Sequence, residues 1–266
     1  MGVELSRRLR MGARALMIYA ATALIFQYLI VLVFRSVDVG ALGPMMDILP
    51  QGVRALIGAE VAQLFSAPGF LAFIFIHPMM LVLYLAFVIA FASGGLAGEI
   101  ERRTIAVVLV RPVTRPQIVG GVALVLLLGT TLLMAVLWGG TAIWPALYGL
   151  GPVNHTAFAW VAGAGLAVLW SLAGVALLAS AAASEGGRAA GAGVGFALVS
   201  YLGNYLANLS PEWAWLRPYS MFSYWDPQEI IRRGGAQWGD LSVPLAVAAV
   251  SMLLAVIVFA RRDIAV

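Results

Sequence analysis

The stretch FLAFIFIHPMMLVLYLAFVIAFA, residues 70–92, contains no charged side chain. About 20 consecutive apolar residues in an α-helix are enough to cross the hydrocarbon core of a bilayer, so this stretch predicts a membrane-spanning helix. Segments of the same kind recur along the chain. The six predicted spans are residues 15–34, 70–92, 118–140, 156–183, 189–209 and 241–260.

The composition agrees with a chain that lies mostly in lipid. Of its 266 residues, 62% are hydrophobic and 11% are charged, whereas soluble domains have about 45–50% apolar and about 25% charged residues. We therefore expect an all-α polytopic membrane protein in which residues 1–266 form a single transmembrane domain. Gln27 and His77 are the most polar residues inside the spans, and we expect them to form hydrogen bonds between helices.

Several kinds of chemistry are excluded by the residues that the chain lacks. All 16 basic residues are arginine, so there is no lysine for a Walker phosphate-binding loop or a Schiff base. The chain also has no cysteine, which excludes disulfides, thiol catalysis and cysteine-bound metals. Its two histidines, His77 and His155, are too few for a metal cage. We expect no cofactor or metal in this chain.

The arginines predict the orientation of the spans, because basic residues are retained on the cytoplasmic side. With a cytoplasmic N-terminus, 11 arginines lie inside and 5 outside; the outer ones are Arg35, Arg54, Arg217, Arg232 and Arg233. Both termini are therefore expected in the cytoplasm and the chain in the cell inner (plasma) membrane. This asymmetry also explains the pI of about 9.8 without nucleic acid as a partner.

The two long outer loops both contain predicted helices. Residues 50–65 have apolar side chains at helical spacing, which is typical of an amphipathic helix at a membrane interface. Residues 210–240 hold several tryptophans and tyrosines, which prefer the headgroup level, so this loop is expected at the membrane surface or re-entrant. Within it, Asp226 is a predicted N-cap with Pro227 at the first helical position, Glu229 completes a capping box, and Gly234 ends the helix.

The inner loop GGLAGEIERRTIAVVLVRPVTRPQ, residues 94–117, contains an apolar run that is too short to cross a membrane. Exposed to water, this run would cost about 25 cal/mol per Å² of apolar area, so something must cover it. Thr104 is placed to cap a short helix that Pro112 ends. Physical reasoning leaves two alternatives open, namely a docking element for a cytoplasmic protein and an interfacial helix on lipid.

The loop also resembles a known family. Glu99-x-Glu101-x-x-Thr104, an aliphatic run and then Arg111-Pro112-Val113-Thr114-Arg115 are similar to the E-x-E-x-GT…LL…PVSR segment of ABC-2 type permeases, the membrane subunits of ATP-binding-cassette transporters. The ending Phe259-Ala-Arg261-Arg262-Asp263 resembles the F-x-RRD ending of that family, and Tyr224-Trp225-Asp226-Pro227 resembles its outer-loop segment. The resemblance extends over the six spans and both outer loops. Arg103 stands where the family has a glycine.

The resemblance implies a non-catalytic permease subunit that exports a substrate across the bacterial inner membrane. Two copies of this chain would assemble with two cytoplasmic ABC ATPase subunits, which hold the ATP and Mg²⁺. The loop would be the coupling helix, with Ile105, Val108 and Leu109 as its buried contact and Glu101, Arg102 and Arg115 at the charged rim. The ATPase-coupling residues implied are Glu99, Glu101, Arg102, Thr104, Ile105, Val108, Leu109, Pro112 and Arg115.

The fifth predicted span carries two patterns with open alternatives. Gly187, Gly191 and Gly195 form overlapping GxxxG motifs, which suit either a dimer seam with a second copy or packing within the chain. Tyr201, Asn204, Tyr205 and Asn208 share another face at helical spacing. They are candidates for the wall of a translocation path, and packing against the following outer loop explains them as well.

Two other functional classes compete with a transporter. One is a mechanotransmission subunit that couples a cytoplasmic ATPase to an extracytoplasmic partner without moving a solute, which the large outer loops favour. The other is an intramembrane enzyme, either a protease or a lipid transferase. Ser93 and His77 would be its serine–histidine pair, but 16 residues of helix place them roughly 24 Å apart. The substrate of a transporter stays open.

Overall fold

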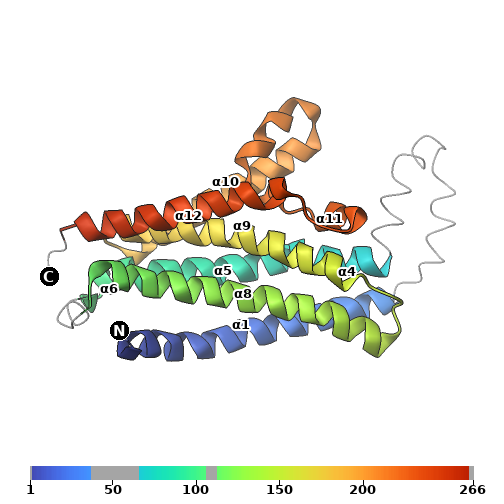
Figure 1. Cartoon of the computed structure of the whole chain (residues 1–266), viewed down its shortest axis with the longest axis horizontal. Coiled ribbons are helices and arrows are strands. Elements are labelled where there is room, and N and C mark those ends of the chain that lie inside the picture. Colours follow the sequence, from blue (N-terminus) through green and yellow to red (C-terminus); the bar gives the residue numbers. More distant parts are fainter. Residues whose placement is uncertain (1, 37–65, 106–112, 264–266) are drawn as a thin grey trace.

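The computed structural model describes residues 2–36, 66–105 and 113–263, and helices are the regular elements of these ranges (Figure 1). The amphipathic helix predicted at residues 50–65 lies outside the described residues. The helices are α1 (Gly2–Ser36), α4 (Ala67–Ile76), α5 (Pro78–Gly95), α6 (Ala97–Glu101), α8 (Arg115–Tyr148), α9 (His155–Ala182), α10 (Gly186–Leu209), η2 (Pro211–Tyr219), η3 (Met221–Tyr224), α11 (Pro227–Arg233) and α12 (Trp238–Arg261), where η2 and η3 are 3₁₀-helices.

The long helices run side by side as one elongated bundle with two distinct ends (Figure 1). One end holds both termini, the α5–α8 loop and the α9–α10 turn, and we call it the proximal end. The opposite end holds α4 and the end of α8, with α11 beside it, and we call it the distal end; the segment after α10 that contains η2 projects from the side of the bundle toward this end (Figure 1). The arrangement therefore gathers the loops that were predicted on one side of the membrane at one end of the bundle.

Within the described residues, five helical stretches are long and apolar enough to cross a membrane, as in an all-α, multi-pass membrane protein. They are Ala13–Ser36, Ala67–Gly95, Arg115–Tyr148, His155–Ala182 and Trp238–Arg261. The fifth predicted span forms α10, which has 24 residues but is not among the five. Its glycines and the side chains of Arg188, Asn204 and Asn208 lower its mean hydropathy, so that its crossing of the membrane stays a prediction.

The predicted span at residues 70–92 is broken into two helices at His77 and Pro78. Proline has no N–H to donate and its ring clashes with the preceding turn, so α4 ends and α5 begins there. His77 caps α5, because its Nδ1 accepts a hydrogen bond from the Met79 N–H at 3.2 Å. Among the described residues, the hydrogen bond of the His77 side chain is thus this cap and not a bond to another span, and its ring lies 4.9 Å from that of Phe26 on α1.

The same expectation for Gln27 is confirmed. Its side chain is fully buried on α1, and Nε2 donates a 3.0 Å hydrogen bond to the carbonyl oxygen of Leu137 on α8. This carbonyl lies one helical turn before Gly140, whose missing side chain leaves room for the amide. A Cβ atom at Gly140 would lie only 1.8 Å from Gln27 Oε1.

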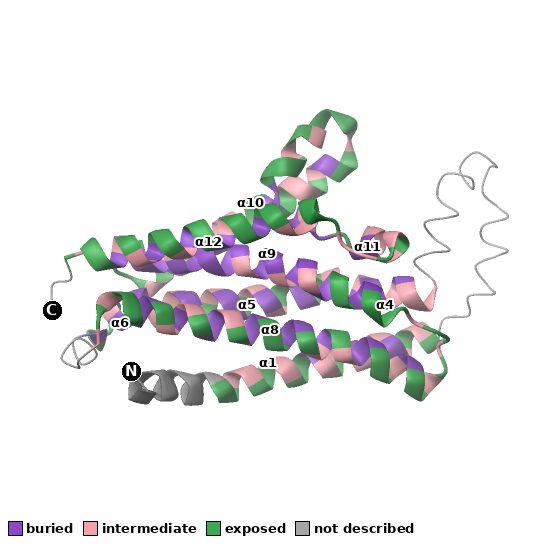
Figure 2. Ribbon diagram, in the orientation of Figure 1, coloured by how far each residue is buried: buried purple, intermediate pink, exposed green. Residues whose placement is uncertain are grey.

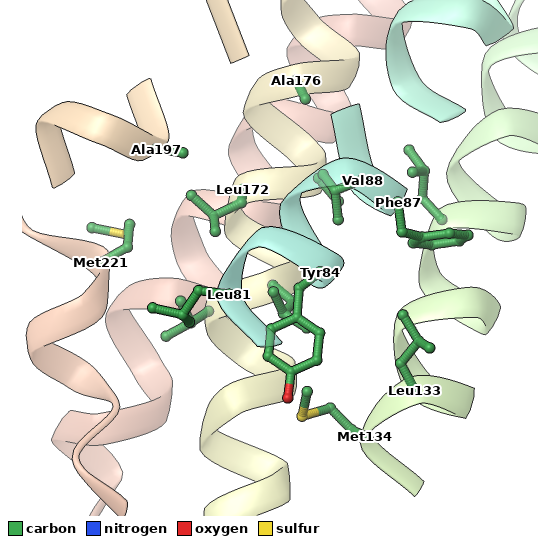
Figure 3. Close-up of a cluster of buried hydrophobic side chains, with 14 of the residues drawn as sticks. Leu81, Tyr84, Phe87, Val88, Leu133, Met134, Leu172, Ala176, Ala197 and Met221 are labelled. Atoms are coloured by element: carbon green, nitrogen blue, oxygen red, sulfur yellow. The ribbon is translucent and has the colours of Figure 1, made fainter. Parts of the chain in front are cut away.

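The bundle is built around α9. In α9, 72% of the most apolar window is buried, compared with 17% in α1 (Figure 2). Small residues on α9 allow close neighbours, since a Cβ atom at Gly165 would meet the Trp225 ring at 2.4 Å and one at Gly174 would meet Ser251 Oγ at 2.2 Å. Figure 3 shows the apolar side chains of α5, including Tyr84 and Phe87, packed between α8 and α9.

The contact between Gln27 and Gly140 predicts a large difference between two adjacent glycines. Gly140→Ala forces the buried amide away and should lower the free energy of unfolding by about 1–3 kcal/mol. Gly139→Ala is the control, because nothing described lies within 4 Å of its Cβ position and alanine favours the helix by up to about 1 kcal/mol. Thermal unfolding in detergent micelles measures both, and equal midpoints would contradict the packing.

Candidate functional site

The loop after α5 is folded against the proximal end of α9. Leu96 and Ala97 are fully buried, and the Ala97 N–H donates a 3.0 Å hydrogen bond to Ser180 Oγ. The Ser180 hydroxyl in turn donates to the Ser93 carbonyl oxygen at 3.4 Å. A short helix, α6, is thereby held by α9 and not only by its own chain neighbours.

The two glutamates of the loop lie in different surroundings. Glu99 is buried, with 8% of its surface exposed, inside the proximal end of the bundle. Glu101 is exposed, and its Oε2 accepts a 2.8 Å hydrogen bond from the N–H of Gly186, the first residue of α10. A carboxylate is favoured there because the first N–H groups of a helix have no partner inside the helix. Glu101 therefore ties the loop to α10.

Arg103 adopts a backbone conformation that favours glycine. Its φ of 58° makes it the one non-glycine residue with positive φ in the described part of the chain. This conformation costs a residue with a Cβ atom about 1–2 kcal/mol. A glycine would adopt this conformation without strain, whereas Arg103 adopts it at the cost of strain.

Thr104 and Arg102 close the turn between α6 and the following segment. Thr104 Oγ1 donates to the Glu99 carbonyl oxygen at 3.2 Å, so its hydroxyl is directed back to α6. Arg102 donates to the Gly94 carbonyl oxygen at 3.4 Å. Helical backbone resumes at Ile105, where this described range ends.

The three residues expected to contact an ATPase are not equivalent. Ile105 is 2% exposed and belongs to the hydrophobic core of this chain, so it anchors the segment from inside. Val108 and Leu109 lie outside the described residues, as does Pro112. After them Thr114 caps α8 through a capping box with Gln117, whose Oε1 accepts from the Thr114 N–H at 2.9 Å.

Arg115 and Arg262 link three helices at the proximal end. Arg115, the first residue of α8, donates to the carbonyl oxygen of Ala260 at 3.3 Å and also to that of Arg262, at the end of α12. Arg262 donates to the carbonyl oxygens of Ala181 and Ala183 at 3.0 and 2.6 Å, where α9 ends. A guanidinium is favoured there because the last carbonyls of a helix lack partners.

The role of Arg262 was missed by reasoning from the sequence. The FARRD ending was noted only as a resemblance, and the charge was counted only for orientation. The signal that could have found it is an arginine placed directly after a span, opposite the small-residue end of another span. Hydropathy does not say which helix ends lie together, so the partners of Arg262 needed the structure.

The glycine strip of α10 has no partner within the described chain. A Cβ atom at Gly187, Gly191 or Gly195 would meet nothing within 4 Å. Gly193, on another face, lies against α9, since its Cβ position is 3.4 Å from the side chain of Ala176. Packing within the described chain therefore uses a glycine outside the strip.

The polar stripe of α10 divides between two cavities. Tyr201 lines an apolar groove of about 570 Å³ between α5 and α10. Asn204 and Asn208 line a polar cavity of about 320 Å³ at the distal end, and Asn208 Oδ1 accepts from Arg217 of η2 at 3.3 Å. Tyr205 is 57% exposed. Asn208 thus contacts the following loop, and Asn204 accepts from Asn208 at 3.4 Å, which supports packing against that loop as the explanation for this part of the stripe.

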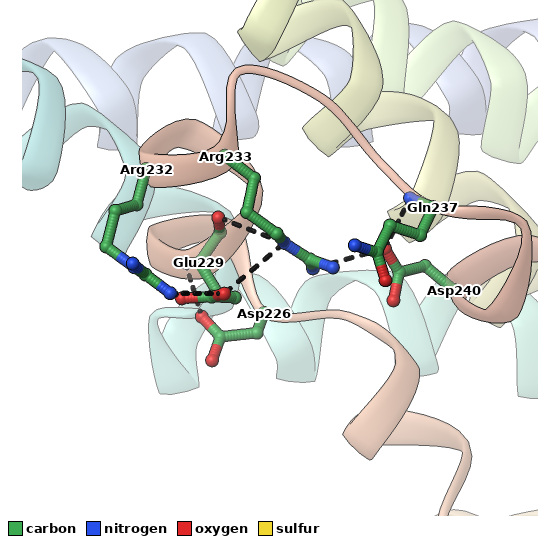
Figure 4. Close-up of polar contacts among 6 residues, drawn as sticks. All are labelled: Asp226, Glu229, Arg232, Arg233, Gln237 and Asp240. Carbon is green, nitrogen blue, oxygen red and sulfur yellow. Dashed lines mark hydrogen bonds and ion pairs between the residues drawn. The ribbon is translucent and has the colours of Figure 1, made fainter.

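The predicted helix in the distal loop is confirmed as α11 (Figure 4). Asp226 Oδ1 accepts a 3.1 Å hydrogen bond from the Glu229 N–H, and Gly234 ends the helix with φ 77°. The Glu229 carboxylate pairs with Arg232 at 2.6 Å and Arg233 at 3.4 Å instead of turning back to the cap. Arg233 also pairs with Asp240 at 3.2 Å, which joins α11 to the start of α12.

Compared with known proteins, the chain matches no protein-family model and no curated protein. The described residues hold no group of three or more histidine, cysteine or acidic side chains that could bind a metal ion. The proximal site is instead a set of hydrogen bonds that connects one loop to several helices. One loop is bonded to the start of α10 through Glu101, to the end of α12 through Arg115, and to α9 through Ala97.

The strain at Arg103 predicts that Arg103→Gly makes the turn more stable. Relief of about 1 kcal/mol should slow amide hydrogen exchange in residues 97–105 about fivefold. Arg103→Ala removes the same charge but keeps a Cβ atom, so it should not slow the exchange. Mass spectrometry of the exchanged peptides measures this, and equal protection in the two variants would contradict the strain.

Proposed function

We propose that this chain is the permease subunit of an ABC-type exporter, driven by a separate cytoplasmic ATPase. The observation that carries the proposal is the loop at residues 94–117. It has the charge and apolar pattern of an ABC-2 coupling segment, and its described part is bonded to helices on several sides of the bundle. The chain itself is non-catalytic in this proposal, and ATP and Mg²⁺ belong to the ATPase.

The bonds at the proximal end suit the transmission of force. Glu101 is hydrogen-bonded to the N-terminus of α10. Arg115 lies at the N-terminus of α8 and contacts the last carbonyls of α12. A displacement of the loop by an ATPase would therefore reach several membrane helices at once. Rigid helices that move together are the usual elements of such transitions. Val108 and Leu109 are proposed to contact the ATPase, and Ile105 to anchor the segment in the permease.

The proposed assembly contains two permease copies and two ATPase subunits in the cell inner membrane, with both termini in the cytoplasm. α10 is the sixth span in this assembly. The unfilled glycine strip on α10 supports a close contact with a second copy. The apolar groove between α5 and α10, with Tyr201 at its distal end, is the proposed wall of the translocation path.

A second candidate is mechanotransmission to an extracytoplasmic partner without transport. The observation in its favour is the distal loop, where Trp213, Trp215, Tyr219 and Trp238 are all exposed. Rings of this kind also suit the headgroup level of a bilayer. Both candidates require the same coupling loop, and movement of a solute by the purified complex in proteoliposomes separates them.

The absence of cysteine allows a clean test of the six-span topology. Ser184→Cys lies at the proximal start of α10 and Tyr219→Cys in the distal loop after it. If α10 crosses the membrane, a membrane-impermeant maleimide added to intact cells labels only Tyr219→Cys, and Ser184→Cys reacts after permeabilisation. Labelling of both from one side would reduce the topology to five spans.

The coupling role predicts that polar substitutions in the apolar run release the ATPase. Leu109→Asn, and independently Val108→Asn, should reduce co-purification of an ABC ATPase with the tagged permease by at least roughly tenfold, because buried apolar anchors dominate such contacts. Permease-stimulated ATP hydrolysis should fall in parallel. Leu209→Asn, a 66% exposed leucine at the distal end, is the matched control.

Two results would overturn the coupling proposal. One is a tagged wild-type permease with which no ABC ATPase co-purifies from native membranes. The other is a Leu109→Asn variant that retains full ATPase binding and stimulation. Thermal unfolding of each variant in detergent shows whether the permease itself has remained folded.

A further inference from the structure

Two cavities of opposite character lie along α10 and share Phe222 in their walls. The groove of about 570 Å³ is lined by apolar side chains apart from Ser93 at its proximal end and Tyr201 at its distal end. Its α5 wall reaches from Pro78 to Ser93, which is about 22 Å of helix at 1.5 Å per residue. A groove of this length and character suits a hydrocarbon chain.

The second cavity, of about 320 Å³, is polar and adjoins the first. Asn204 and Asn208 of α10 line it together with Arg217, Ser223 and Asp226 of the distal segment. Phe222 lines both cavities, and its ring lies edge-on to Tyr201 with centroids 5.8 Å apart. The two cavities are therefore neighbours along α10, with the Phe222 and Tyr201 rings between them.

The polar cavity is lined by one positive and one negative side chain, both of them exposed, and neither forms an ion pair with a described residue. Arg232 and Arg233 pair with Glu229 and Asp240, whereas the described acceptors of the Arg217 guanidinium are the Ala207 carbonyl and Asn208, at 3.5 and 3.3 Å. Asp226 caps α11 and forms no ion pair with the described chain, Arg217 included. A ligand that carries both charges can therefore pair with both side chains without breaking an existing ion pair of the described chain.

We propose that the two cavities together bind one amphiphile with a zwitterionic phosphate–amine headgroup. Its phosphate would accept hydrogen bonds from the Arg217 guanidinium and its ammonium would pair with the Asp226 carboxylate. Its hydrocarbon chain would lie in the groove between α5 and α10. A purely anionic headgroup is disfavoured by Asp226. As the substrate class of the permease, this assignment rests on the proposed function, whereas the binding itself does not require an ATPase.

The test uses the purified full chain in detergent, with dioleoyl phosphatidylethanolamine and dioleoyl phosphatidylglycerol at equal concentration. Native mass spectrometry counts each bound lipid. The wild-type chain should retain phosphatidylethanolamine about tenfold better than phosphatidylglycerol, and Arg217→Ala should reduce its retention about tenfold, as expected for one charge-assisted contact. Arg232→Ala is the matched control, because it removes an outer arginine that is already paired, and it should leave retention unchanged.

Two further variants separate headgroup from tail. Asp226→Asn keeps an N-cap side chain, so α11 persists, and it should abolish the preference between the two lipids. Val194→Trp fills the groove from a 48% exposed position and should reduce retention of both lipids. Inorganic phosphate and glycerophosphoethanolamine, which lack a hydrocarbon chain, should not displace the bound lipid. Unfolding midpoints confirm that each variant is folded.

Three results would overturn the assignment. Equal retention of both lipids by the wild type and all variants would show bulk lipid only. Displacement by inorganic phosphate alone would show a simple anion site. A lipid-free dimer that Val194→Trp dissociates would show a second copy of the chain in the groove. Since no ATPase is present, failure here leaves the coupling experiment unaffected, and failure of ATPase binding leaves this one unaffected.

Discussion

Close packing around α9 is the constraint on which the rest of the structure depends. In a bilayer, lipid tails are as apolar as the helices, so association relies on van der Waals contact and on hydrogen bonds between helices. Gly165 and Gly174 provide that contact, because Trp225 and Ser251 occupy the space that their side chains would fill. Trp225 also donates a 3.0 Å hydrogen bond to the Val161 carbonyl oxygen, which fixes the distal segment to the same helix.

The end of α9 also connects the elements at the proximal end of the bundle. At the end of α9, Arg262 donates hydrogen bonds to the carbonyl oxygens of Ala181 and Ala183. The α5–α8 loop is bonded to the same end through the Ser180 hydroxyl. The described part of the loop, residues 96–105, is therefore packed against the bundle. Under the proposed function, an ATPase would push on a segment that already belongs to the bundle, through Ile105 on its buried side.

The sequence was sufficient for the elements whose physics is local. Hydropathy predicted five long helices close to their observed positions, and the residues at Asp226 and Gly234 predicted α11, because spans and caps depend on nearby residues alone. The break at His77 was also local, since Pro78 marks it, yet the apolar run was treated as one span. The bonds of Glu101 and Arg262 could not be predicted, because they depend on which helix ends lie together.

The departure of α10 from the hydropathy of the other long helices follows from what surrounds it. A helix that faces lipid on every side gains nothing from an unfilled glycine strip, a tyrosine at the end of a groove or two asparagines near one end, because lipid tails offer no partner for them. On α10 these features occupy different faces, toward open space, toward α5 and toward the distal loop. Two of these faces thus have neighbours other than lipid within the described chain, namely α5 and the distal loop, and the low hydropathy of α10 accords with these contacts. A count of apolar residues penalises the same side chains that make such a helix useful at a contact or along a path.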